Sequence, residues 1–305
     1  MQSLLFFVVY PFAWLFSRLP MRVLYVISDI LFVLIYYIFG YRKEVVLRNI
    51  SRVFPEKTDL EKKELSKKFF QHFSDMLIEI VKGFSMGKNE ILKRYTYKNP
   101  ELLNSFVKNK KSIALVGAHQ ANWEWSINLP LIAETEVFGA YNQLRNPYFD
   151  ATLKKSRERF GVKGIKTSEM VKEMVLNYKN TIQGIYILLS DQSPLIEKTF
   201  YWTNFFGVKV PVHTGLEMLA KKFDLVVINY HTKKIKRGYY ETEFQLITEN
   251  PNEFENFELT EKYLTLTEKN IRQNPEVYLW SHNRFKHEHR FEEWQKMTIS
   301  KKTKN

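Results

Sequence analysis

The chain has 305 residues, of which 45% are hydrophobic and 26% charged, so it can bury a full globular core. The absence of cysteine excludes disulfides, thiolate zinc sites and cysteine nucleophiles. The formal net charge of +13 fits a protein that binds anionic lipid or an acidic protein, and it also fits a basic surface that is simply solvated. Nucleic acid is a less favoured partner because zinc-finger spacings and basic heptads are missing.

Two apolar stretches open the chain, at 4–16 and 23–40, with a short basic break between them. About 20 apolar residues cross a bilayer, so the second stretch is long enough, with Asp29 as a penalty, and the first is short. A signal peptide is disfavoured because no basic region precedes the first stretch and no small-residue cleavage site follows it. We expect residues 1–41 to form an uncleaved membrane anchor, either one span or a hairpin in one leaflet. Two buried core helices are the alternative.

Basic residues follow this segment at once, which by the positive-inside tendency predicts that the main domain is cytoplasmic. The next region, 42–110, is expected to be helical. Over 58–82, apolar residues recur at helical spacing with lysines and glutamates between them. Thr58 or Asp59 is the expected N-cap, and Gly83 the expected stop.

From residue 111 to 295, short apolar runs alternate with helical patterns. The expected strands are 112–116, 137–141, 184–189, 225–230, 243–247 and 277–280. The expected helices are 149–160, 167–179, 213–223 and 260–273. This alternation predicts an α/β core with a mixed, mostly parallel central sheet flanked by helices. The lysine-rich tail 296–305 is expected to be frayed and to lie near anionic lipid.

His119 follows the first expected strand of this core, at the sheet edge where ligands bind in open α/β folds. Glu124 comes five residues later, across a strand-to-helix turn that can fold the carboxylate back onto the imidazole. A carboxylate in that position fixes the tautomer, so that the imidazole can take a proton from a substrate hydroxyl. By itself the spacing is a weak pattern, because an unrelated surface histidine and glutamate also produce it.

Four stretches, in this order, resemble the bacterial lipid A biosynthesis acyltransferases, which acylate a lipid hydroxyl from a thioester donor. They are 117–124 with its His-x4-acid motif, 141–150 with its Tyr, Asn-Pro and closing Asp, 191–194 with Phe-Phe-Gly at 205–207, and 280–286 with Trp-x-His-x-Arg-Phe-Lys. With the N-terminal anchor they cover nearly the whole chain.

The resemblance implies an O-acyltransferase in which His119 is the general base and Glu124 its orienting partner. It also implies a cation in the second block that binds donor phosphate or stabilises an oxyanion. Because Asn142 stands where the family often has arginine, Arg145 is the expected substitute. The expected substrate-binding residues are Asn122, Tyr141, Asn146, Asp191, Gln192, Arg284 and Lys286. For Arg145, Asp191 and Arg284, a structural ion-pair network is the competing interpretation.

The same resemblance implies no cofactor beyond the co-substrate, acyl-acyl carrier protein or acyl-coenzyme A. An acidic carrier protein also fits the net charge. The expected acceptor is a lipid A precursor, and the expected place is the cytoplasmic face of a bacterial inner membrane. Two alternatives stay open: an acyltransferase for another polar lipid, and a non-catalytic protein that binds lipid at the membrane surface.

Two further patterns are set aside. Residues 83–87 match the Gly-x-Ser-x-Gly nucleophile elbow, but an expected helix precedes them where an elbow needs a strand. The histidines at 282, 287 and 289 have no zinc-helix spacing and have basic neighbours, so no metal site is expected.

Overall fold

The protein is described by a computed structural model that places residues 2–302. Four α-helices form the N-terminal part: α1 (Gln2–Arg18), α2 (Met21–Val33), α3 (Lys43–Val53) and α4 (Asp59–Gly83). A π-helical turn, Leu34–Ile38, continues α2. Thr58 caps α4 with a reciprocal pair of hydrogen bonds to Glu61, so the expected boundaries of this helix are confirmed. The helix ends at Gly83 and a loop follows, which confirms that residues 83–87 are no nucleophile elbow.

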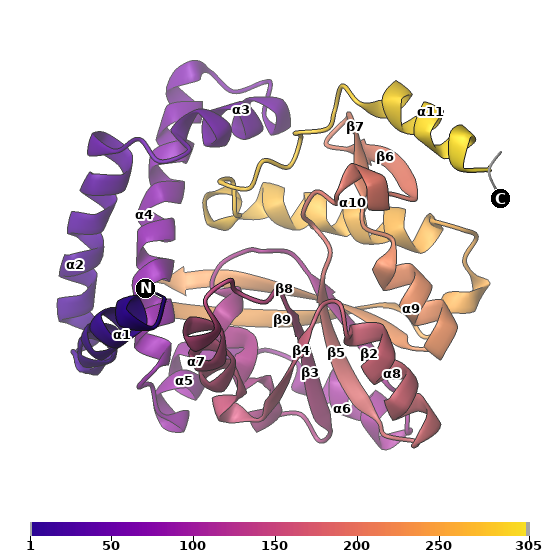
Figure 1. Ribbon diagram of the computed structural model, residues 1–305, viewed down its shortest axis with the longest axis horizontal. Helices are drawn as coiled ribbons and strands as arrows, with labels where there is room; N and C mark the ends of the chain where they lie inside the picture. The colour runs from indigo at the N-terminus through magenta and orange to yellow at the C-terminus, as the bar shows by residue number, and fades with distance from the viewer. Residues whose placement is uncertain (1, 303–305) are drawn as a thin grey trace.

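A seven-stranded sheet in the order β1-β9-β8-β2-β5-β3-β4 forms the centre (Figure 1). Its strands are β1 (Tyr95–Tyr97), β2 (Ile113–Gly117), β3 (Glu136–Tyr141), β4 (Val162–Lys166), β5 (Gly184–Leu189), β8 (Val226–Lys236) and β9 (Tyr239–Thr248). All neighbours pair in parallel except β8 and β9, which form an antiparallel hairpin. The predicted mixed, mostly parallel α/β sheet is therefore confirmed. A separate antiparallel hairpin consists of β6 (Tyr201–Phe205) and β7 (Val208–Val212).

Helices cover both faces of the sheet. They are α5 (Lys88–Arg94), α6 (Pro100–Lys108), α7 (Pro147–Arg157), α8 (Met170–Lys179), α9 (Gly215–Phe223) and α10 (Glu258–Gln273). Helix α11 (Phe291–Lys302) lies away from the sheet and packs on Trp202 of the β6–β7 hairpin. Side chains that alternate along β2 enter two different cores: Ala114 and Val116 pack with α8, α9 and α10, and Ile113 and Leu115 pack with α6. Strand β2 is thus buried on both faces, as its continuous apolar run predicts.

The run 277–280 is not a strand, and here the prediction was wrong. Its first residue belongs to a short 3₁₀ turn, Pro275–Val277, and Tyr278 makes only an isolated bridge to Gln120. The run is apolar because Trp280 is a buried core side chain, not because it belongs to the sheet.

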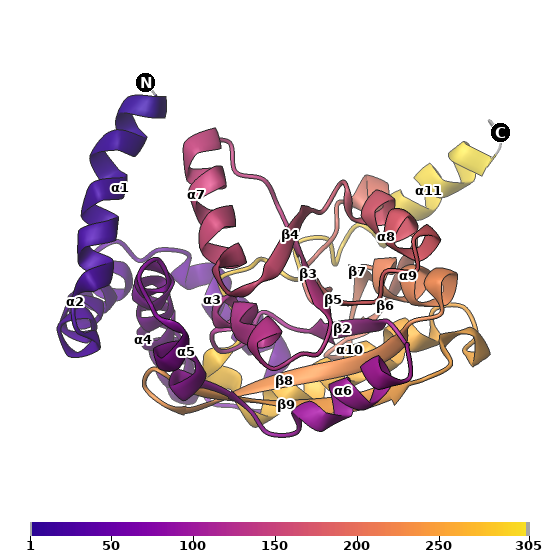
Figure 2. The same ribbon diagram turned by 90° about the horizontal axis from the view of Figure 1, so that it is seen from below.

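The apolar segment Met21–Ile38 is long enough to cross a membrane, by length and composition alone. Its buried side chains recur every three or four residues and pack on α4, and they include Leu24, Ser28 and Phe32. Large hydrophobic side chains such as Val26 and Ile30 remain exposed on the other side. The alternative that the two N-terminal apolar stretches are buried core helices is therefore wrong. Together with α1, this segment forms one flank of the molecule, far from α11 (Figures 1 and 2).

Gly117, at the end of β2, has no room for a side chain. An added Cβ would lie 2.6 Å from the Cε1 atom of the buried Tyr230 ring. We expect Gly117→Ala to lower the free energy of unfolding by about 1–3 kcal/mol, because the rigid ring must shift in a packed core. Gly215→Ala is the matched control, since its Cβ would meet nothing within 4 Å at the start of α9. Chemical denaturation measures both, and equal effects would contradict the packing described here.

Candidate active site

His119 and Asp191 meet because of how two neighbouring strands are aligned. Strands β2 and β5 are parallel, with Gly117 opposite Leu189, and each of the two residues lies two positions beyond that pair. The Nδ1 atom of His119 lies 2.7 Å from a carboxylate oxygen of Asp191, and the backbone N–H of His119 donates to the other oxygen at 3.2 Å. This two-point contact fixes the imidazole ring at the carboxyl edge of the sheet.

The charges at this contact support each other. Burial lowers the pKa of His119, but attraction and hydrogen bonding to Asp191 outweigh it and leave that pKa above its usual value. Burial would raise the pKa of Asp191, which is 1% exposed, yet the imidazole and its hydrogen bonds bring it below the usual value. With Nδ1 held by the carboxylate, Nε2 is the ring nitrogen left to exchange a proton with a ligand.

Glu124 does not contact the imidazole. The prediction that Glu124 is the carboxylate paired with His119 was therefore wrong, since Asp191 takes that place. The two oxygens of Glu124 accept hydrogen bonds of 2.9 and 2.7 Å from Arg157, at the end of α7. The cause is local: Asn122 caps a 3₁₀ helix, Trp123–Leu131, by accepting from the Trp125 N–H. This helix directs Glu124 toward α7, from where its charge still raises the pKa of His119 as a minor contribution.

A cavity of about 290 Å³ lies beside these residues. His119, Glu124, Lys154 and Arg157 contribute its charged wall, and Tyr141 and Asn142 line it as well. Its apolar wall consists of Ile127, Leu144, Leu153, Val162, Ile187 and Leu189. The volume is at the small end of the range for ligand sites, and a wall of this kind suits an apolar chain next to a polar reacting group.

The cavity's guanidinium is Arg157, which the sequence analysis did not single out. At the end of a predicted helix, beside Lys154 and Lys155, it looks like part of a solvated basic turn. Arg145, the expected cation, is exposed and does not belong to the cavity wall in the described part of the chain. Bidentate pairing with Glu124 holds the Arg157 guanidinium at the cavity.

Several predicted substrate-binding residues have structural partners instead. Asn146 caps α7 by accepting from the N–H groups of Tyr148 and Phe149. Asn122 is fully buried, and its amide donates to Glu79 of α4 at 2.7 Å. Neither side chain is therefore free to face a ligand in this arrangement.

Residues of the last predicted block, 280–286, bind segments next to the site and do not line the cavity. Arg284 is 2% exposed, donates to the Pro211 carbonyl at 3.1 Å and lies over the Phe205 ring. His282 accepts a 2.9 Å hydrogen bond from the Ser193 N–H, which holds the loop that follows Asp191. Gln192 is half-buried in that loop, and Lys286 is exposed.

Across residues 2–302, no three histidine, aspartate or glutamate side chains gather in a way that would hold a metal ion. The chemistry that this arrangement offers is proton transfer at the His119–Asp191 pair, next to a fixed guanidinium.

Comparison with known proteins gives a consistent result. Residues 1–287 match the family described as bacterial lipid A biosynthesis acyltransferase. The chain is similar to lipid A biosynthesis acyltransferase 2 of Shigella flexneri, with 25% identity over 48% of this chain and 46% of that protein. It is also similar to the lipid A biosynthesis lauroyltransferase of Escherichia coli K12, with 24% identity over 90% of this chain and 88% of that protein.

A third relative is the lipid A biosynthesis acyltransferase of Haemophilus influenzae, with 25% identity over 64% of this chain and 61% of that protein. The matched part thus spans about half the length of the Shigella relative, and nearly the full length of the lauroyltransferase.

We expect Asp191→Asn to lower the pKa of His119. The amide keeps a hydrogen-bonding group but removes the negative charge that favours the imidazolium, so burial then dominates and lowers the pKa below 6.5. NMR titration of isotope-labelled histidine measures this, with the His119 signal assigned from its loss in His119→Gln. Glu124→Gln is the matched control and should lower the pKa less, because Asp191 makes the larger contribution. A His119 pKa that is unchanged or higher in Asp191→Asn would contradict the contact.

Proposed function

The chain belongs to the bacterial lipid A biosynthesis acyltransferase family, and from this premise we propose that it transfers a fatty acyl chain from a thioester donor to a hydroxyl of a lipid A precursor, with His119 as the general base. The observation that carries the proposal is the imidazole held through Nδ1 by a buried carboxylate, at a cavity with an apolar wall.

The reaction then needs no protein nucleophile. The Nε2 atom of His119 takes the proton from the acceptor hydroxyl as its oxygen attacks the thioester carbonyl. The tetrahedral intermediate collapses, the carbon–sulfur bond breaks, and the imidazolium returns the proton to the departing thiolate. The products are an ester and a free thiol. Asp191 stabilises the imidazolium between these two steps.

Arg157 is the cation that we propose to act on developing negative charge. Its guanidinium lines the same cavity as His119 and is held in place by Glu124. A fixed donor next to the reacting carbonyl stabilises an oxyanion without reorganisation, and the same group can bind a donor phosphate. Glu124 would therefore serve catalysis by positioning Arg157.

We propose acyl carrier protein as the donor and the cytoplasmic face of the inner membrane as the place. The net charge of +13 suits an acidic carrier. For the anchor, a hairpin that lies at the membrane surface is favoured over a free span, because α2 packs along α4 and its Asp29 pairs with Arg237 at 2.6 Å. A helix engaged in this way cannot also be surrounded by lipid, whereas its exposed hydrophobic side can enter one leaflet.

Transfer of label tests the proposal. Purified protein is given labelled acyl-acyl carrier protein and a lipid A precursor in detergent, and His119→Ala is compared with wild type. We expect the rate to fall by about 10²–10⁴-fold, the usual contribution of a general base. His289→Ala is the matched control, since that side chain is 86% exposed.

Acyl-coenzyme A and a different polar lipid are substituted in parallel, and a preference for either corrects the donor or the acceptor. No transfer to any lipid by wild type, or an equal rate in His119→Ala, would overturn the proposal.

A further inference from the structure

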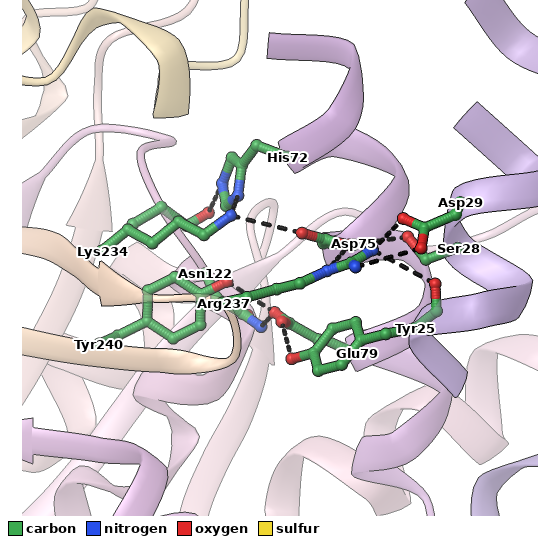
Figure 3. Close-up of polar contacts among 11 residues, drawn as sticks. Tyr25, Ser28, Asp29, His72, Asp75, Glu79, Asn122, Lys234, Arg237 and Tyr240 are labelled. Carbon is green, nitrogen blue, oxygen red and sulfur yellow. Dashed lines mark hydrogen bonds and ion pairs between the residues drawn. The ribbon is translucent and has the colours of Figure 1, made fainter. Parts of the chain in front are cut away.

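Helix α4 carries a buried polar stripe that the catalytic scheme does not use. His72, Asp75, Glu79 and Lys82 recur at intervals of three or four residues and are each at most 7% exposed. This spacing places them on one face of the helix. Figure 3 shows that face between α2 on one side and the β8–β9 hairpin on the other. A helix normally directs apolar residues into a core, so a polar stripe there needs partners.

The partners on one side belong to the loop that carries His119. Glu79 accepts a 2.7 Å hydrogen bond from the Asn122 amide, and its backbone carbonyl accepts from the Trp125 indole at 3.1 Å. Two turns away on α4, the Nε2 atom of His72 lies 3.2 Å from the carbonyl oxygen of Ala121. Two residues of α4 thus hold Ala121 and Asn122 of the loop and Trp125 of the 3₁₀ helix that follows it.

The loop needs such support because its backbone is strained. Ala121 has φ of 55°, in the left-handed region that a residue with a Cβ rarely adopts. A conformation of this kind persists only where the surroundings impose it. The imidazole is two residues away, so relaxation of Ala121 would move the ring relative to Asp191 and to the cavity.

The partners on the other side belong to α2. The Tyr25 hydroxyl donates to Glu79 at 2.8 Å, to the carboxylate oxygen that does not bind Asn122. Ser28 donates to Asp75 at 2.8 Å. Tyr240 of β9 donates at 2.8 Å to the oxygen shared with Asn122. The Glu79 carboxylate therefore binds α2, strand β9 of the sheet and the loop that carries His119 (Figure 3).

This carboxylate is costly to bury. Glu79 is fully buried, and burial raises its pKa to about 7 even though Tyr25, Tyr240 and Asn122 donate to it. An apolar side chain would fill the space at lower cost. The Glu79 carboxylate lowers stability, yet it binds both the loop that carries His119 and helix α2. A role in positioning that loop explains it better than a role in core packing.

We propose that Glu79 is a positioning residue for the acyl transfer, through which the seating of the apolar helix α2 on α4 fixes the backbone that carries His119. The inference rests on the proposed function for its meaning in catalysis, but its structural part stands without it. The position of α2 on α4 and the position of the loop that carries His119 are thereby linked through one carboxylate.

The decisive variants reverse the Glu79–Asn122 hydrogen bond. Glu79→Gln can set an amide donor against the Asn122 amide, so we expect kcat to fall about 10- to 100-fold with KM within two-fold, as for a misplaced base. The double variant Glu79→Gln/Asn122→Asp restores one donor and one acceptor with the same net charge. It should recover most of kcat. Ser74→Ala, equally buried on α4, is the matched control and should leave kcat unchanged.

Hydrogen–deuterium exchange of the peptide that covers 117–125 gives a readout that needs no substrate. We expect faster exchange in Glu79→Gln, a return to the wild-type rate in the double variant, and no change in Ser74→Ala. If wild type transfers no acyl group but this exchange pattern holds, the proposed function has failed and the positioning role has not.

The α2 side is tested by two matched single variants. Tyr25→Phe removes the α2 donor to Glu79 and should speed exchange at 117–125 and lower kcat. Ser28→Ala removes a hydrogen bond between the same helices but leaves Glu79 untouched, so it should lower only the unfolding midpoint. These two also carry the test if Glu79→Gln does not fold.

The proposal is overturned if folded Glu79→Gln keeps wild-type kcat and loop exchange, or if the double variant recovers neither. It is also overturned if Tyr25→Phe and Ser28→Ala change the loop equally.

Discussion

The hydrogen-bonded pair of His119 and Asp191 depends on the register of two parallel strands. Because Gly117 of β2 lies opposite Leu189 of β5, the two side chains leave the sheet edge at the same height. The cavity, the Glu124–Arg157 pair and the loop after Asp191 are arranged around this point. A shift of one residue between these strands would turn one side chain to the other face of the sheet and separate the pair.

Part of this could be read from the sequence. Continuous apolar runs predict buried parallel strands, and they place His119 and Asp191 at sheet edges. What spacing does not reveal is direction. Glu124 is five residues from His119, but the intervening 3₁₀ start turns it toward α7, so the partner had to come from another strand. The sequence does not single out Arg157, because a basic residue in the last turn of a helix usually complements the helix dipole.

The strands that the sequence did not predict lie at the edges of the sheet, β1 and β4, or outside it, β6 and β7. Strand β4 lies at the edge of the sheet and reads Val-Lys-Gly-Ile-Lys, with polar residues that an edge strand tolerates. The hairpin of β6 and β7 lies outside the main sheet. On α4 the apolar periodicity predicts the helix correctly, but it cannot show that His72 and Glu79 point into the protein, because their partners come from α2, β9 and the loop that carries His119.

In the proposed mechanism Asp191 acts through His119, and a double-mutant cycle on the transfer rate measures this coupling directly. Values of kcat/KM are compared for wild type, His119→Ala, Asp191→Asn and the double variant. If the carboxylate works by orienting and charging the imidazole, Asp191→Asn slows the wild type strongly but costs nothing further once His119 is absent. Losses that multiply, so that the double variant is slower than His119→Ala by the full single-variant factor, would show that the two residues act independently and would contradict this account.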